Sequence, residues 1–98
     1  MHFFVFLSYE VLKDEGYNHD FFNNELEEMG LYNKIKKEDE AFQYLPKFTY
    51  IGEYQFEDKE ELKNLLYTEV KQLFKSNGVK ANLFMGVCEK TTIGIEAF

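Results

Sequence analysis

The sequence predicts a single α+β domain over residues 1–98, a ferredoxin-like βαββαβ sandwich. Its length of 98 residues allows one hydrophobic core. Two segments with apolar residues at helical spacing interrupt segments of strand character, in the order β, α, β, β, α, β, β. Right-handed crossovers through both helices give an antiparallel four-stranded sheet with two helices on one face and an extra C-terminal strand.

The first half of the chain supplies an apolar strand and a helix. Residues 3–11 are rich in Phe and Val, which is typical of a central, buried strand. Asn18 is a candidate N-cap of the helix that follows, and Gly30 is placed to end it. Residues 31–37 then alternate apolar and polar side chains, which predicts a short strand.

The second half repeats this arrangement after an acidic run and a loop around Pro46. Residues 48–56 alternate in a way that predicts a strand with one solvated face. Asp58 is placed to cap a second helix. An apolar stripe runs along that helix and comprises Leu62, Leu65, Leu66, Val70, Leu73 and Phe74. Strands are predicted at residues 81–88 and 92–98.

The composition restricts the classes of partner. The chain has 18 acidic and 11 basic residues, a formal net charge of −7 and no Arg. Nucleic-acid binding depends on basic patches, so this balance favours a basic protein partner over RNA. The single cysteine, Cys88, cannot form a disulfide framework, which indicates a reducing compartment, and we expect a cytoplasmic protein. The longest apolar run is too short to span a membrane, and no membrane contact is expected.

Glu10 is the candidate catalytic residue and metal ligand. It lies at the end of the predicted central strand, where a carboxylate can bind Mg²⁺ or act as a general base. The alternative interpretation is an acid that is simply solvated at the end of a strand.

A second candidate site is a cluster of lysines beside two tyrosines. Such a surface holds single-stranded RNA by stacking bases on the rings and pairing phosphates with the ammonium groups. The residues concerned are Lys34, Lys36, Lys37, Lys47, Tyr50 and Tyr54. The alternative is that these lysines protect an edge strand from aggregation.

The segment FVFLSYEVLKDEGYNHDFFNNELEEMGL resembles the start of a small ferredoxin-fold superfamily of CRISPR-associated and GhoS-like endoribonucleases and antitoxins. LPKFTYIGEYQFEDKEELKNLL is similar to their third strand and second helix, and NLFMGVCE to their fourth strand. The resemblance covers most of the chain as a pattern of element lengths and apolar positions. It implies a metal ligand at Glu10, after Tyr9, where the CRISPR-associated branch has an Asp that is paired across a dimer.

Two functional hypotheses follow. The first is a toxin–antitoxin or phage-defence type of protein that acts on RNA as a metal-assisted, Mg²⁺-dependent endoribonuclease, and the resemblance favours it. The second is an acidic protein-binding module, such as an immunity protein, an antitoxin or a nuclease inhibitor, without catalysis, and the charge favours it. A homodimer is also predicted, because the apolar strand at residues 92–98 would otherwise leave an exposed edge.

Overall fold

The computed structural model describes residues 1–13, 15–36 and 41–90. In these ranges the chain forms two helices and five strands. Their order is β1 (His2–Lys13), α1 (His19–Glu28), β2 (Lys34–Lys36), β3 (Phe42–Tyr44), β4 (Thr49–Gln55), α2 (Lys59–Ser76) and β5 (Lys80–Glu89). The strand predicted at residues 92–98, and the dimer contact predicted for it, lie outside the described residues.

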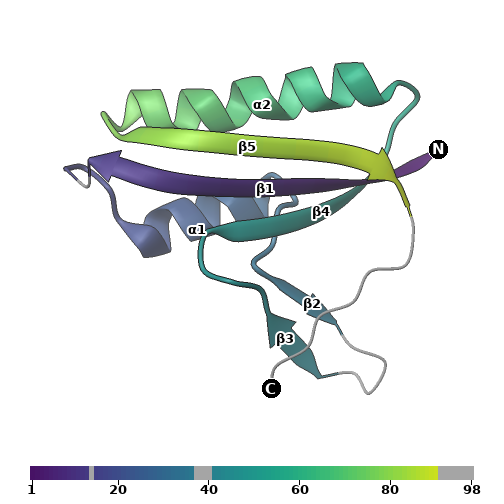
Figure 1. Cartoon of the computed structure of the whole chain (residues 1–98), viewed down its shortest axis with the longest axis horizontal. Helices are drawn as coiled ribbons and strands as arrows, with labels where there is room; N and C mark the ends of the chain where they lie inside the picture. Colours follow the sequence, from purple (N-terminus) through teal and green to yellow (C-terminus); the bar gives the residue numbers. More distant parts are fainter. Residues whose placement is uncertain (14, 37–40, 91–98) are drawn as a thin grey trace.

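The strands form a three-stranded sheet and a smaller two-stranded unit. β1 lies between β4 and β5 and is antiparallel to both, with Val5 opposite Gly52 and Val87. β2 and β3 pair with each other in a hairpin that lies away from the larger sheet (Figure 1). A bridge between Tyr32 and Ile51 connects the start of this hairpin to β4. The predicted α+β class is confirmed.

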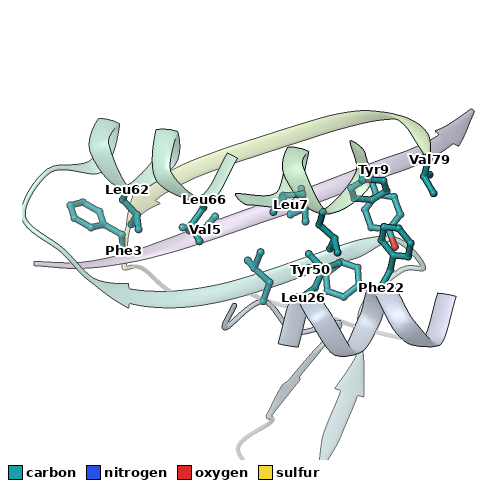
Figure 2. Packing of buried hydrophobic residues seen from close by; sticks show 14 residues of the cluster. Phe3, Val5, Leu7, Tyr9, Phe22, Leu26, Tyr50, Leu62, Leu66 and Val79 are labelled. Atoms are coloured by element: carbon teal, nitrogen blue, oxygen red, sulfur yellow. The ribbon is translucent and has the colours of Figure 1, made fainter. Parts of the chain in front are cut away.

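The core lies between one face of the sheet and the two helices. Alternate side chains of a strand share one face, and those of β1 that are buried are Phe3, Val5, Leu7 and Tyr9. They form one cluster with buried side chains of both helices, so both helices cover the same face, as predicted. Figure 2 shows Phe3 and Leu62 at one end of this core, with Tyr9, Phe22 and Tyr50 gathered at the other.

The helix ends follow the local signals in the sequence. The Asn18 Oδ1 accepts a 3.1 Å hydrogen bond from the Phe21 amide, and the Asp58 Oδ1 accepts a 2.8 Å bond from the Glu60 amide. These bonds satisfy amides that have no partner within the helix. Gly30 has φ 92°, a left-handed conformation that favours glycine after a helix. The predicted caps are therefore confirmed.

Three details of the sequence prediction are wrong. Leu65 is 49% exposed, because the apolar stripe of α2 that meets the sheet runs through its neighbour Leu66 instead. Residues 42–44, for which no strand was predicted, form β3. Tyr50 and Tyr54 of β4 were expected to be exposed, but Tyr50 is buried and Tyr54 is half-buried. Neither helix in the described part of the chain is long and apolar enough to cross a membrane.

Candidate nucleic-acid interface

The β2–β3 hairpin is held at its base by Asn33. The Nδ2 of this side chain donates hydrogen bonds to the carbonyls of Pro46 and Thr49, at 3.1 and 2.6 Å. The Leu45 amide donates to the Asn33 carbonyl at 2.8 Å. Asn33 therefore ties both strands of the hairpin to the start of β4. Because the side-chain bonds fix the backbone where the hairpin leaves the sheet, the strands beyond Asn33 are held in a defined orientation.

One face of this hairpin combines lysines with exposed aromatic rings. The register places Lys34 opposite Tyr44 and Lys36 opposite Phe42. Directly opposed residues of an antiparallel pair project from the same face. Phe42 is 59% exposed and Tyr44 is 67% exposed. We call this set of four residues the hairpin face.

A cation and a ring of the hairpin face are in contact. The Lys34 Nζ lies 4.9 Å from the centroid of the Phe42 ring, within the range of a cation–π interaction. Lys47 makes a similar contact with Phe48, at 5.0 Å. Lys47 follows Pro46, whose carbonyl is bonded to Asn33, so it lies near the base of the hairpin. Of the predicted lysines, Lys34, Lys36 and Lys47 are therefore placed on or beside the hairpin, and Lys37 lies outside the described residues.

The two tyrosines that the sequence suggested for RNA stacking do not lie on this surface. Tyr50 is completely buried, and its hydroxyl donates a 3.0 Å hydrogen bond to the Asn23 Oδ1. Tyr54 is half-buried, and its hydroxyl donates a 2.6 Å bond to the Met29 carbonyl at the end of α1. The exposure predicted for these residues is wrong, because the face of β4 that carries them is the face that packs against the helices.

Tyr50 belongs to a polar cluster inside the aromatic end of the core. The Tyr9 and Tyr17 hydroxyls are 2.8 Å apart, and the Tyr17 hydroxyl lies 2.7 Å from the His19 Nδ1. Burial raises the pKa of Tyr9, Tyr17 and Tyr50, because a phenolate loses its hydration there. These hydroxyls thus stay protonated and serve as hydrogen-bonding groups that join α1 to the sheet.

Because burial raises the pKa of these tyrosines, we expect the folding stability of the protein to fall in alkaline solution. Burial, with a smaller contribution from Glu69, raises the pKa of Tyr54 from 10.0 to about 12. The unfolded chain releases this proton near pH 10, whereas the folded chain retains it, so the free energy of unfolding decreases from pH 10 to about pH 12. Urea unfolding followed by circular dichroism across this range measures the decrease. Tyr54→Phe is expected to make the decrease smaller, and an identical pH profile for this variant would contradict the assignment.

Glu10 lies within β1, on the face of the sheet away from the helices. Its neighbours Tyr9 and Val11 face the core, and Glu10 itself is exposed. It lies opposite Asn82 of β5, and the Asn82 Nδ2 donates a 3.2 Å hydrogen bond to its Oε1. Within residues 1–13, 15–36 and 41–90, no three His, Cys, Asp or Glu side chains come together in a way that could hold a metal ion. The hydrogen-bond partner of Glu10 is therefore the side-chain amide of Asn82. Its role as a Mg²⁺ ligand stays a prediction.

The aromatic residues of the hairpin face were missed in the sequence. Phe42-Gln43-Tyr44 alternates as Lys34-Ile35-Lys36 does, and this pattern was the available signal. A search of protein-family models, of curated proteins and of solved structures found no match to this chain. The function of the hairpin face must therefore be inferred from its own geometry.

Proposed function

We propose that this protein binds single-stranded RNA through the hairpin face. The observation that supports it is the exposure of Phe42 and Tyr44 on the same face as Lys34 and Lys36. Large aromatic side chains are usually buried in a core or in an interface. Two aromatic side chains that remain exposed beside lysines therefore suit contact with RNA, a polyanion whose bases are flat rings. Bases stack on the rings, and phosphates pair with the ammonium groups.

Single-stranded RNA fits this surface better than a duplex. In a duplex the bases are already stacked on one another, whereas unpaired bases are free to turn onto protein aromatics. The paired part of the hairpin has only three residues in each strand, which suits a few nucleotides. Because the whole chain carries a net charge of −7, attraction to phosphate is local to the hairpin. The affinity should therefore depend strongly on salt.

We also propose that the fold is the ferredoxin-like βαββαβ sandwich. The order β4-β1-β5 and two helices on one face support it, with the bridge at Tyr32 standing in for a short outer strand beside β4. This assignment agrees with the resemblance to small endoribonucleases and antitoxins of the CRISPR-associated and GhoS-like kind. A role in a toxin–antitoxin or phage-defence system belongs to the same proposal, as does Mg²⁺-assisted cleavage through Glu10.

The test is the salt dependence of RNA binding. Fluorescence anisotropy with a labelled oligouridylate is expected to show binding at low salt that weakens steadily as salt is added. Replacing Lys34 and Lys36 by Gln removes two phosphate contacts, which should reduce the log–log slope by about 1.4 units. The control is the pair Lys59→Gln and Lys63→Gln on α2, which changes the net charge equally and should leave the slope unchanged.

Two results would contradict the proposal. One is an equal reduction of the slope in both double variants, which would show that only the overall charge matters. The other is an absence of binding by the wild-type chain at low salt. In that case the acidic protein-binding module becomes the better hypothesis, and a basic protein partner should be sought.

A further inference from the structure

A pocket of about 870 Å³ lies between the C-terminal half of α2 and the start of β5, which run side by side (Figure 1). Its volume falls within the range of about 300–1,000 Å³ that is typical of small-molecule sites. None of its lining residues belongs to the hairpin face. It is lined by Leu12, Tyr67, Lys71, Phe74, Lys75, Gly78, Val79, Lys80, Ala81, Asn82 and Leu83. We call it the lysine pocket.

The apolar residues of the lysine pocket form a surface that could contact the apolar part of a ligand. Phe74 and Val79 are almost fully buried, so they form its base. Tyr67 and Leu12 also line it and remain 39% and 55% exposed. Leu12 lies where the pairing of β1 with β5 shifts register between Val11 and Lys13. An apolar or aromatic group placed here would remove these exposed surfaces from water, which is favourable.

The charge of the lysine pocket is opposite to that of the protein. Among the described residues, Lys71, Lys75 and Lys80 line it and no acidic residue does, although the chain has 18 acids and 11 bases. In the described part of the chain, none of these three lysines forms an ion pair. Glu10 does not line the pocket, but it is bonded to Asn82, which does. The pocket is therefore a local cationic site in an acidic protein.

The lysines of this pocket also repel one another and their neighbours. Lys71 and Lys75 are four residues apart on α2, a spacing at which like charges destabilise a helix. Lys80 is paired with Lys13 of β1 in the sheet register, and like charges that face each other across strands are unfavourable too. A bound anion would relieve both repulsions. The unpaired charge is thus the second feature, besides the apolar base, that indicates a ligand.

We propose that the lysine pocket binds a small organic anion with an apolar or aromatic body. The body packs against Phe74, Val79 and Tyr67, and the acidic head group pairs with Lys71, Lys75 and Lys80. Carboxylate, sulfonate and phosphate head groups share the charge that this site requires. This site is independent of RNA binding at the hairpin face, so either proposal can fail without the other.

The test uses anilinonaphthalene sulfonate, which has an aromatic body and one anionic group, and the neutral phenylnaphthylamine, which lacks that group. Fluorescence titration of the full chain is expected to show saturable binding of the sulfonate. Replacing Lys71, Lys75 and Lys80 together by Gln should weaken sulfonate binding about tenfold, since each exposed ion pair contributes modestly. Binding of the neutral probe should not change in this variant. Leu12→Ser should weaken the binding of both probes.

The control variant replaces Lys59, Lys63 and Lys90 by Gln, which changes the net charge equally and should leave sulfonate binding as in the wild type. Amide chemical-shift mapping with the sulfonate should place the largest changes at residues 78–83 and on the Lys71–Lys75 turn. The proposal is overturned by an absence of saturable binding, by equal weakening in the control, or by shifts centred elsewhere, such as around Phe84.

Discussion

Replacing Leu66 by Ala is expected to lower the free energy of unfolding by about 2–5 kcal/mol, the usual cost of truncating a buried Leu. Leu66 is 4% exposed and belongs to the cluster that joins α2 to β1. The truncation removes buried methyl groups and leaves a cavity that the neighbouring side chains fill only in part. Because small domains are stable by about 5–15 kcal/mol, this loss is a large share of the total. Urea denaturation followed by circular dichroism measures it.

Leu65→Ala is the matched control for this prediction. It makes the same chemical change one residue earlier in α2, at a side chain that is 49% exposed. Alanine also has a slightly better helix propensity than leucine. We expect a change within about 0.5 kcal/mol, as is usual for surface positions. Equal losses in the two variants would show that the packing face of α2 is assigned wrongly.

The ends of both helices could be predicted because cap chemistry is local. Asn18 and Asp58 each satisfy an amide within three residues of themselves, so neither depends on the rest of the fold. Gly30 and Gly78 have positive φ directly after the helices, which is also a local requirement. The order of helices and long strands followed from these ends and from the apolar periodicity between them.

Which face of a strand is buried could not be predicted in the same way. Alternation in β4 divides its residues into two sets, but which set is buried depends on where the helices pack. The sequence therefore left Tyr50 exposed, whereas the helices cover it and Asn23 binds its hydroxyl. A Cβ on Gly52 would lie 2.5 Å from the Gly30 carbonyl oxygen, and this close approach of α1's end to β4 is likewise a tertiary feature.

The short strand β3 was missed for a different reason, whereas its partner β2 lies within the strand predicted at residues 31–37. Both strands have three residues each, and in β3 this is too short for periodicity to separate a strand from a loop. Their stability comes from Asn33 and from pairing across the hairpin, which are contacts between residues six or more positions apart. The lysines were recognised as a candidate site, but their aromatic partners were sought on β4 instead of β3.

Replacing Phe42 and Tyr44 together by Ala is expected to weaken RNA binding by about thirtyfold or more. Stacking of one base on one aromatic side chain is worth about 1–3 kcal/mol, and the proposal assigns one base to each ring. Because both side chains are exposed, the variant should keep its stability within about 0.5 kcal/mol. The dissociation constant for a labelled oligouridylate, with a melting curve for each variant, gives both quantities.

Phe84→Ala separates the hairpin face from other exposed aromatics. Phe84 is 69% exposed, but it lies on β5 opposite Ser8, on the face of the sheet away from the helices. We expect this substitution to leave the dissociation constant unchanged. A loss of affinity at Phe84 with none at Phe42 and Tyr44 would move the RNA site from the hairpin to that face of the sheet.

The most direct test of RNA binding at the hairpin face is amide chemical-shift mapping during titration of the wild-type chain with oligouridylate. We predict that the largest shift changes occur at residues 32–36 and 41–47, which include the hairpin face and its base at Asn33. Amides of α2 and of the start of β5 should change little. Changes centred on α2 and β5 or on the strand around Phe84, or no changes at low salt, would contradict RNA binding at the hairpin face.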